Sequence, residues 1–326
     1  MPKDASKTSR AAPIPVVLKA SLRGAERTKL ARRIEELFRK RGARARILSL
    51  GPKGRVPRVS AVSKHRIVVA AGGDGTVATV AAKLARTKRT LGVLPLGTFN
   101  HFAKDVGIPL DLEGAVDVIL AGRARRIDVA QVNGRVFLNN SSVGAYPEIV
   151  RRREKEREEL GLGKLPAFAL ATARILQRPP LLDIELRVKG GATTRRTPGV
   201  FFGNNVYAME GRKIGTRERL DAGRLSIFLV HATGTAGLLR VMGRALLGQL
   251  HYDPEFESVE VRRATLSVPR RRRLPVAWDG EISWMKTPLR YRILPLALSV
   301  LSPVAPKNAP RAKAKRGKTP GGHRGK

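Results

Sequence analysis

A glycine-rich turn, Gly72-Gly73-Asp74-Gly75-Thr76, is the stretch of this sequence whose residue types and spacing point most directly to chemistry. It follows an apolar strand-like segment and opens a helix-like one. Glycine lets the backbone approach a phosphate closely, and the first N–H groups and macrodipole of a helix favour an anion. Thr76 could cap the helix or hydrogen-bond a phosphate oxygen, whereas the Asp74 carboxylate would repel phosphate unless Mg²⁺ lay between them or Asp74 bonded to another group. The turn therefore predicts a phosphate site, against the simpler interpretation of an ordinary Asp-Gly turn.

Two further elements carry polar groups at the ends of strand-like segments. Residues 94–104 repeat the order of strand, glycine, threonine and helix, with Gly97, Thr98 and Asn100 in the turn. Turns that follow neighbouring parallel strands face the same crevice, so we expect these two turns to lie together. Much later comes Asp279-Gly280-Glu281, which taken alone is typical of a turn at the end of a strand.

The segments that must position these residues fall into two kinds. In the first half, strands at residues 15–18, 46–50, 66–70 and 91–94 alternate with helices at residues 26–41 and 77–88. This alternation predicts a parallel sheet flanked by helices. After residue 111 the pattern changes to short strands in hairpins, two of them around Asn133-Gly134 and Gly190-Gly191. The expected fold class is α/β, with an N-terminal α/β nucleotide-binding domain and a C-terminal antiparallel β domain.

Four ordered motifs together resemble the diacylglycerol kinase catalytic-domain family, which includes bacterial lipid kinases and sphingosine kinases. They are the glycine-rich turn at residues 72–76, the Gly-Thr-x-Asn element at residues 97–100, Gly203-Asn204-Asn205, and Asp279-Gly280-Glu281. The resemblance extends from about residue 14 to about residue 303. Four motifs in the same order are far more specific than one glycine turn.

The resemblance implies a kinase that phosphorylates a lipid hydroxyl with ATP and Mg²⁺, binding the nucleotide in a cleft between the α/β domain and a β-sandwich domain. It implies that Asp279 acts as general base for the acceptor hydroxyl, with Glu281 beside it in the catalytic site. The nucleotide-binding residues that it predicts are Gly72, Gly73, Asp74, Gly75, Thr76, Gly97, Thr98, Asn100 and Ser21, and the predicted metal ligands are Asp74 and Asp105.

The chain departs from the family pattern at three places. His101 stands where family members carry an Asp, and His is a poor ligand for Mg²⁺, so Asp105 on the same helical face is expected to stand in. The Asn-Pro-x-Ser-Gly nucleotide motif is absent, and Ser21 or Lys19 is expected to substitute. Residues 220–225 look like the family's Asp-Gly-x-Leu segment with a shifted residue. If Asp105 does not stand in, we expect altered metal use or low activity.

Composition limits the classes of partner. The 326 residues include no cysteine, which excludes disulfides, zinc-thiolate sites and cysteine nucleophiles. The formal net charge is +38, of which residues 14–303 retain +28. Such a charge attracts phosphate, in nucleotides, anionic membranes or nucleic acid. The predicted organisation is a basic tail (1–13), an α/β ATP-binding domain (14–129, to which residues 288–303 return), a β-sandwich lipid-substrate domain (130–287) and a second basic tail (304–326).

Two other functions compete with lipid phosphorylation. NAD kinases and phosphofructokinase-like enzymes have a related glycine turn, but the second element and the late Asp-Gly-Glu favour a lipid kinase. A catalytically weakened nucleotide-binding or nucleic-acid-binding protein fits the charge, yet only 5% of residues are aromatic and no nucleic-acid-binding motif is found.

The expected partners are a lipid substrate and an anionic membrane surface, with nucleic acid as the weaker explanation of the charge. No apolar run reaches the ~20 residues of a membrane span, and no secretory signal is recognised. We therefore expect a cytoplasmic protein that associates peripherally with the inner face of the membrane. The acceptor lipid (diacylglycerol, a sphingoid base, phosphatidylglycerol or another) and the oligomeric state stay open.

Overall fold

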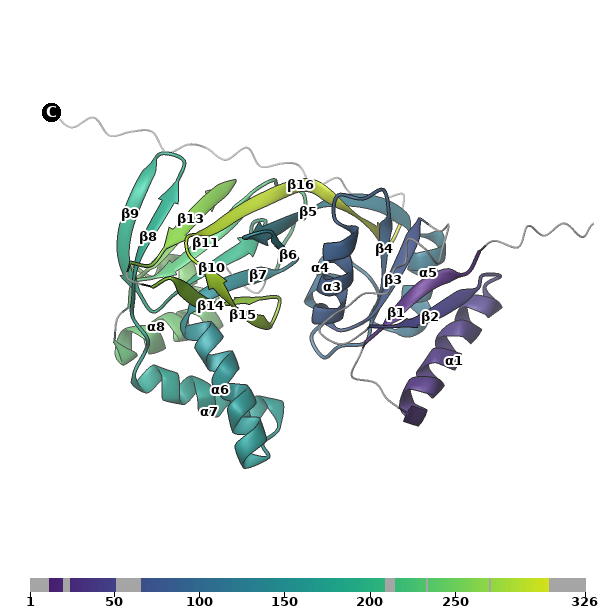
Figure 1. The fold of residues 1–326 in the computed structure, drawn as a ribbon, viewed down its shortest axis with the longest axis horizontal. Coiled ribbons are helices and arrows are strands. Elements are labelled where there is room, and N and C mark those ends of the chain that lie inside the picture. The colour runs from purple at the N-terminus through teal and green to yellow at the C-terminus, as the bar shows by residue number, and fades with distance from the viewer. Residues whose placement is uncertain are drawn as a thin grey trace, which may run out of the picture.

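A computed structural model describes residues 12–19, 24–50, 66–208, 215–232, 234–269 and 271–304. Ser21, Arg270 and nearly all of the two terminal segments lie outside the described residues. The described chain forms two halves that lie side by side, an α/β half with the first strands and a β-rich half with the later ones (Figure 1).

The α/β half is built on four parallel strands in the order β2-β1-β3-β4. Strand β1 is buried along its whole length, and helix α1 turns Ile34, Leu37 and Phe38 toward the sheet, as a central strand and an amphipathic helix should. The strands are β1 (Ile14–Leu18), β2 (Ala45–Ser49), β3 (Ile67–Gly72) and β4 (Thr90–Pro95), and the helices are α1 (Gly24–Lys40), α3 (Asp74–Leu84), α4 (His101–Val106) and α5 (Leu112–Ala121).

The β-rich half contains a six-stranded antiparallel sheet in the order β12-β11-β10-β7-β14-β15. Its strands are β7 (Asn140–Gly144), β10 (Gly199–Asn204), β11 (Leu225–Val230), β12 (Phe256–Val261), β14 (Arg273–Trp278) and β15 (Glu281–Lys286). Helices α6 (Ala145–Leu160), α7 (Lys164–Gln177) and α8 (Thr235–Leu246) and the 3₁₀ turn η3 (Leu250–Tyr252) accompany it. The expected fold class, a parallel α/β domain followed by an antiparallel β domain, is confirmed.

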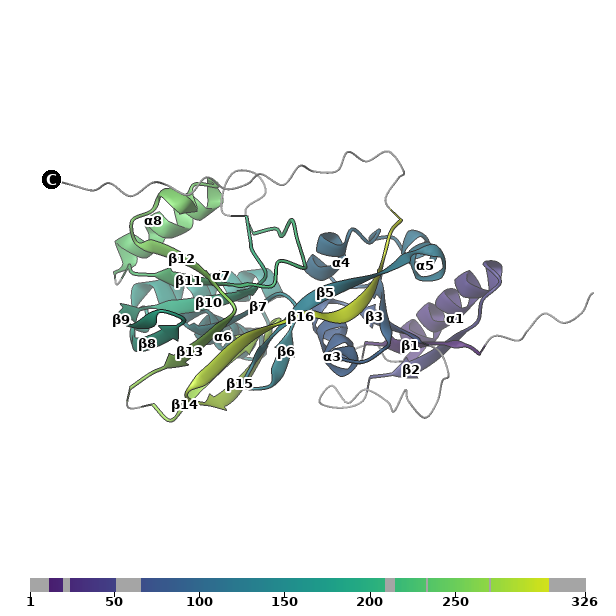
Figure 2. The same cartoon turned by 90° about the horizontal axis from the view of Figure 1, so that it is seen from above.

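One ten-stranded sheet runs through both halves, which the sequence did not predict. Strand β16 (Leu289–Ser302) pairs parallel with β4 at Ser299 and Val300, and pairs antiparallel with β5 (Arg123–Val132) and β13 (Arg263–Ser267). The sheet continues through β8 (Leu182–Val188) and β9 (Gly191–Thr197), and β6 (Arg135–Phe137) pairs with β5. Seen from above, β5 and β16 lie between the two halves (Figure 2). Backbone hydrogen bonds therefore join the halves.

Two hydrophobic clusters form the cores, and β5 and β16 contribute to both. In β5, Ile127 and Val129 belong to the first cluster, while Ala130 and Val132 belong to the second. A bulge in β16 separates Leu294 from Leu298 in its pairing with β5. Burial of apolar surface on both sides of this bulge stabilises each half separately.

Helix α6 is longer than expected, because the sequence predicted a helix only over residues 154–160. It begins at Ala145, directly after Gly144, whose φ is +99°. A Cβ at Gly144 would lie 2.3 Å from the carbonyl oxygen of Pro198, so only glycine fits this abrupt change from strand to helix. None of the helices in the described ranges is long and apolar enough to cross a membrane.

Asp128 ties three segments together at the junction of the two halves, and its replacement should destabilise the fold. Its carboxylate is buried and accepts hydrogen bonds from the backbone N–H groups of Gly223 (2.6 Å) and Leu296 (2.7 Å). We predict that Asp128→Ala lowers the free energy of unfolding by about 2–3 kcal/mol, because two amides lose their acceptor. Urea denaturation measures this loss. The control Asp183→Ala, at a carboxylate side chain that is 71% exposed, should change little, and equal stability of both variants would contradict the prediction.

Candidate functional site

The two glycine turns pack directly against each other. A Cβ at Gly97 would lie 2.5 Å from the Cα of Gly73, and a Cβ at Gly72 would lie 2.5 Å from the hydroxyl oxygen of Thr76. These glycines are required for close approach of backbone and side chain. By contrast, a Cβ at Gly75 would meet nothing within 4 Å, so Gly75 is the glycine of the turn beside which space is left for a ligand.

Helix α3 starts at Asp74 and has Gly73 as its N-cap, with no side-chain capping bond. Because Gly73 has no side chain to accept from them, the first N–H groups of α3 can meet an anion. Asp74 itself does not turn toward its own helix. Its two carboxylate oxygens accept the backbone N–H groups of His101 (3.2 Å) and Phe102 (3.1 Å), so Asp74 caps the N-terminus of α4.

The second turn is fixed by its own asparagine. The Asn100 side chain accepts from the Gly97 N–H and donates to the Gly97 carbonyl, both at 2.9 Å, and its backbone is left-handed with φ +50°. This bonding gives Asn100 the role of shaping the turn. Thr98 is exposed, as is His101, whose ring stacks on Phe99 at 5.6 Å between centroids.

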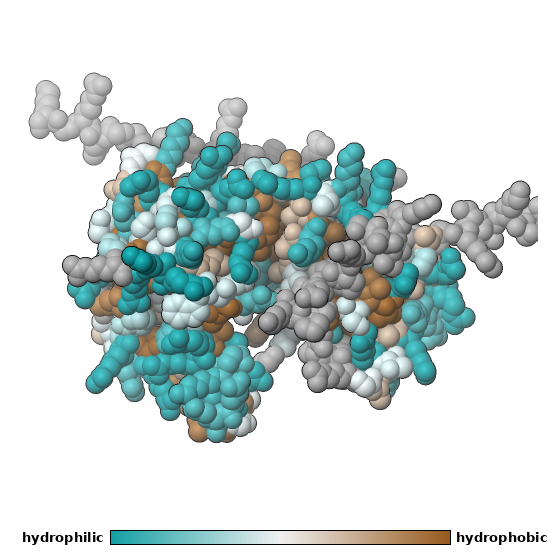
Figure 3. All heavy atoms as spheres, viewed as in Figure 1, coloured by the Kyte–Doolittle hydropathy of each residue, from teal (hydrophilic) through white to brown (hydrophobic). Residues whose placement is uncertain are grey.

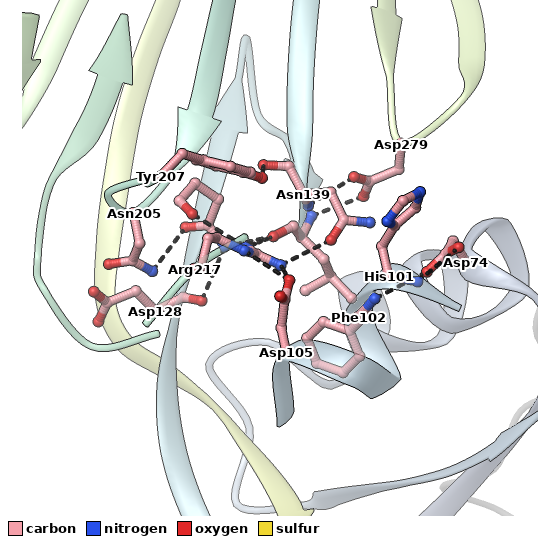
Figure 4. Close-up of polar contacts among 12 residues, drawn as sticks. Asp74, His101, Phe102, Asp105, Asp128, Asn139, Asn205, Tyr207, Arg217 and Asp279 are labelled. Carbon is pink, nitrogen blue, oxygen red and sulfur yellow. Dashed lines mark hydrogen bonds and ion pairs between the residues drawn. The ribbon is translucent and has the colours of Figure 1, made fainter. Parts of the chain in front are cut away.

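Asp279 sits in the tight turn between β14 and β15, with left-handed φ angles at Asp279 (+46°) and Gly280 (+84°). Its carboxylate accepts the backbone N–H groups of Leu138 (2.7 Å) and Asn139 (2.8 Å), and its own N–H donates to the Asn140 carbonyl (3.0 Å). Figure 4 shows the Asp279 carboxylate pointing at Asn139, with His101 and Asp74 on the same side of the site. Two bonds thus hold the carboxylate in one orientation, and the third fixes the backbone of Asp279.

Burial raises the pKa of Asp279 to about 6. The backbone N–H donors of Leu138 and Asn139 and the positive charge of Arg217 act in the opposite direction, because each favours the ionised form. A carboxylate with a pKa near 6 is mostly ionised at pH 7 and is a stronger base than an ordinary Asp. These are the properties required of a general base that works near neutral pH.

Two clefts meet at Asp279. The first, of about 780 Å³, lies between α3 and the β6 and β14–β15 turns, and its polar lining includes Gly75, Thr79, Lys83, Arg135 and Glu281. The second, of about 400 Å³, is lined by residues from α4, α6 and the loop after β10, among them Asp74, His101, Lys104, Asp105, Tyr146 and Tyr207. A group transferred from one cleft to the other would pass beside Asp279.

The buried Arg217 side chain, which sequence analysis missed, occupies the centre of the site (Figure 4). It pairs with Asp105 through Nε (2.9 Å) and Nη2 (2.6 Å) to Oδ2. The predicted metal ligand Asp105 is thus engaged by a side-chain cation. Arg217 also lies 5.3 Å from the centroid of the Tyr207 ring, and burial raises the pKa of Tyr207 to about 12.

The polar side chains of the site suit a Mg²⁺ ion that binds together with a nucleotide better than they suit a metal site formed by the protein alone. No group of three His, Cys, Asp or Glu side chains in the described ranges could hold a metal ion. Asp74 makes no ion pair with a described residue, although both its oxygens bind α4 amides. Mg²⁺ commonly binds one or two carboxylates together with substrate phosphates and water, so Asp74 is the residue that would hold it.

Comparison with known proteins identifies the family. The Diacylglycerol kinase catalytic domain matches residues 16–132, and the YegS C-terminal NAD kinase beta sandwich-like domain matches residues 146–302. A diacylglycerol kinase from Bacillus subtilis is 31% identical over 231 residues, covering 69% of this chain and 74% of that protein. This chain belongs to the diacylglycerol kinase family. A diacylglycerol kinase from Staphylococcus aureus is 27% identical over 243 residues, 73% of this chain and 75% of its own.

Solved structures show the same fold. A crystal structure of a diacylglycerol kinase from Bacillus anthracis superposes with a TM-score of 0.66 at 22% identity, covering 89% of this chain and 96% of that one. Membership of the family makes the chain a kinase related to lipid kinases, with ATP as its phosphate donor. The resemblance inferred from the four sequence motifs is thereby confirmed.

The structure brings together most, but not all, of the predicted site residues. Asp279 lines both clefts; Gly75 and Glu281 line the first, and Asp74 and Asp105 line the second. Gly72, Gly73, Thr76, Gly97 and Asn100 build the paired turns behind them. Ser21 lies outside the described residues, so its role, like nucleotide contacts from Thr98 and Asn100, stays a prediction.

Leu138 and Asn139 join the site through backbone N–H groups, for which the sequence carried no signal. Arg217 is one basic residue among 64, so its type alone could not select it. Asn204 did carry a signal, as part of the Asn-Asn motif. Its amide donates to the Leu138 carbonyl (2.8 Å) and, at longer range, to the Asp128 carbonyl (3.3 Å). The motif therefore supports the backbone beneath Asp279.

Replacement by alanine should distinguish Gly97, which is required for packing, from Gly75, which borders open space. Gly97→Ala should lower the free energy of unfolding by about 1–3 kcal/mol, because its methyl group would collide with the backbone of Gly73. The matched variant Gly75→Ala should keep or slightly raise stability, since it adds a helix-favouring residue in open space. Chemical denaturation of both variants checks this, and a stable Gly97→Ala protein would refute the packing of the two turns.

Proposed function

We propose that this protein is a lipid kinase that transfers the γ-phosphate of ATP to the hydroxyl of a diacylglycerol-like lipid. The observation that carries the proposal is the Asp279 carboxylate, held by two backbone N–H groups at the meeting point of two clefts. Family membership supplies the kinase chemistry and ATP. The acceptor lipid and the catalytic residues go beyond family membership and are what we propose.

In this proposal the nucleotide occupies the first cleft. The open space at Gly75 and the uncapped start of α3 suit its phosphates, and Lys83 and Arg135 on opposite walls supply positive charge. Mg²⁺, held by Asp74 from the side of the second cleft, would neutralise charge on the phosphates that reach the junction of the two clefts at Asp279. The acceptor lipid enters the second cleft, where Phe99, Tyr146 and Tyr207 offer apolar ring surface.

The reaction needs one proton acceptor and one in-line displacement. Asp279 takes the proton of the acceptor hydroxyl, and the oxygen forms a bond to the γ-phosphorus while the bond from that phosphorus to the bridging oxygen of ADP breaks. The products are ADP and a lipid phosphate monoester, and the proton leaves Asp279 to solvent. Glu281, exposed at the mouth of the first cleft, is proposed to assist at the nucleotide side.

Asp279→Asn should reduce kcat by about 10²–10⁴-fold, because an amide cannot accept the proton. A radiolabel assay with γ-labelled ATP and diacylglycerol vesicles, followed by lipid extraction, measures transfer directly. Asp183→Asn, on an exposed carboxylate of β8, is the matched control and should behave as wild type. Full activity of Asp279→Asn would exclude Asp279 as the base, and transfer to NAD instead of lipid would favour the NAD-kinase alternative.

The pH dependence follows from the raised pKa of Asp279. A general base must be ionised, so kcat/KM should fall as the pH drops through about 6, where an ordinary Asp would remain ionised to about pH 4. Initial rates between pH 4.5 and 8, in buffers of constant ionic strength, define this limb. A profile that is flat to pH 4.5 would contradict the assignment.

We further propose that the protein docks on an anionic membrane through a basic surface formed by Arg263, Lys286, Arg290 and Arg292. These residues line a shallow depression of about 820 Å³ on β13, β15 and β16. None of them makes an ion pair with a described residue, and Arg263 lies directly opposite Arg292 in the sheet. Gly134 lines both this depression and the first cleft, so a membrane bound here lies beside the nucleotide side of the site. The face in Figure 3 is largely hydrophilic over the β-rich half.

Replacing three of these bases should weaken membrane binding. We expect Arg263→Gln/Arg290→Gln/Arg292→Gln to lower partitioning onto phosphatidylglycerol vesicles by roughly 100-fold at low salt, since each base near the surface contributes ~1 kcal/mol. The control Lys29→Gln/Arg32→Gln/Arg39→Gln removes the same charge from exposed positions of α1. Equal loss in both variants would show that net charge, and not this surface, governs binding, while tight duplex-DNA binding without vesicle binding would favour nucleic acid.

A further inference from the structure

Arg217 is a buried cation whose hydrogen-bonding capacity is completely used. Its side chain is fully buried, and the paired Asp105 side chain is 14% exposed. Besides the two bonds to Asp105, Nη1 donates to the carbonyls of Leu138 (2.5 Å) and Asn204 (3.1 Å), and Nη2 donates to the Asn139 Oδ1 (2.8 Å). These five bonds match the five N–H donors of a guanidinium. Because every N–H donor of this buried cation has an acceptor, specific contacts determine the position of the guanidinium.

The acceptors of Arg217 include the two residues that hold Asp279. Leu138 and Asn139 donate their backbone N–H groups to the Asp279 carboxylate, while the Leu138 carbonyl and the Asn139 side chain accept from Arg217. The same short segment between β6 and β7 is thus gripped on one side by the guanidinium and on the other by the carboxylate. A shift of the guanidinium would shift both N–H groups.

The other end of the contact chain reaches the phosphate-binding turn. Asp105 lies in α4, and the N-terminus of α4 is capped by Asp74 of the glycine turn. The contacts therefore run from Asp74 through α4 to Asp105 and Arg217, and from there to the segment beneath Asp279. One guanidinium connects the turn proposed to bind the phosphates with the proposed base.

We propose that Arg217 is a positioning residue for phosphoryl transfer: its guanidinium fixes the Leu138–Asn139 amides under Asp279 and sets the distance between this base and the glycine turn. The inference rests on the proposed function, and it adds a residue that neither the motifs nor the family comparison assigned. Arg217 touches neither reactant; it acts through Asp279. Misplacement of a catalytic group by about 1 Å can cost 10²-fold in rate.

Arg217 also contributes to the charge balance around Asp279. The charged and titratable groups facing Asp279 come from α3, α4, α6, β6, β15 and the loop after β10; they are Asp74, Lys83, His101, Lys104, Asp105, Arg135, Tyr146, Arg153, Tyr207, Arg217 and Glu281. The positive charge of Arg217 is one of the effects that lower the pKa of Asp279 and so limit its rise. Loss of this cation should therefore move the acid limb of the pH profile upward.

The test separates geometry, charge and stability with three variants. Arg217→Lys keeps a charge but cannot reach all five acceptors, so kcat should fall about 100-fold with KM nearly unchanged and the acid limb in place. Arg217→Met should lower kcat at least as far and should shift the acid limb to higher pH. Arg217→Met/Asp105→Leu removes the whole ion pair; it should recover thermal stability, because no buried charge is left unpaired, but it should not recover kcat.

A measurement that needs no catalytic turnover tests the positioning role of Arg217 independently of the proposed function. Carboxyl ¹³C NMR titration of the apoprotein, with the Asp279 signal assigned from Asp279→Asn, should show a higher Asp279 pKa in Arg217→Met than in wild type. Wild-type kcat and an unchanged limb in the folded double variant would overturn the positioning role, as would an unchanged Asp279 pKa in Arg217→Met. Absence of lipid phosphorylation by wild type, together with the expected NMR shift, would instead sink the proposed function alone.

Discussion

The site depends on the two hydrogen bonds that the backbone N–H groups of Leu138 and Asn139 donate to the Asp279 carboxylate. Burial of this carboxylate disfavours its ionised form, and these donors offset part of that penalty. The result is a carboxylate with a raised pKa that is still mostly ionised near neutral pH. The donors belong to the junction between β6 and β7, and β7 pairs with β10 and β14 on its two sides, so the carboxylate is held by the backbone of paired strands.

The relative placement of the two clefts follows from the strands that both halves share. Strands β5 and β16 pair along almost their whole length, and each contributes apolar residues to both cores. Asp128 in β5 binds the backbone at the β16 bulge and at Gly223. A hinge between the halves would have to break these backbone bonds. The sheet thus positions the glycine turns of one half opposite the β14–β15 turn of the other.

The sequence predicted the site residues that lie in short motifs, but not those whose role depends on contacts between distant segments. The glycine turn, the second turn and Asp279-Gly280-Glu281 could be recognised because backbone conformation and local order determine them. Arg217 and Asp105 are separated by 112 residues, and Leu138 acts through its backbone, so no local pattern reveals either. For Asp74 the sequence suggested a metal ligand, and the structure adds that its carboxylate caps the N-terminus of α4. The sequence predicted that residues 288–303 return to the α/β domain, but the single ten-stranded sheet was missed because β16 also pairs with β5 and β13, which lie in distant parts of the chain.

We propose above all that the cleft at Asp279 transfers phosphate from ATP to a lipid hydroxyl. The most direct measurement incubates the wild-type protein with γ-labelled ATP and Mg²⁺ in the presence of diacylglycerol-containing anionic vesicles, and quantifies labelled lipid and ADP together. The account predicts one labelled phosphate monoester in the lipid fraction for each ADP formed. ADP formation without labelled lipid, or label on a soluble acceptor such as NAD, would contradict it.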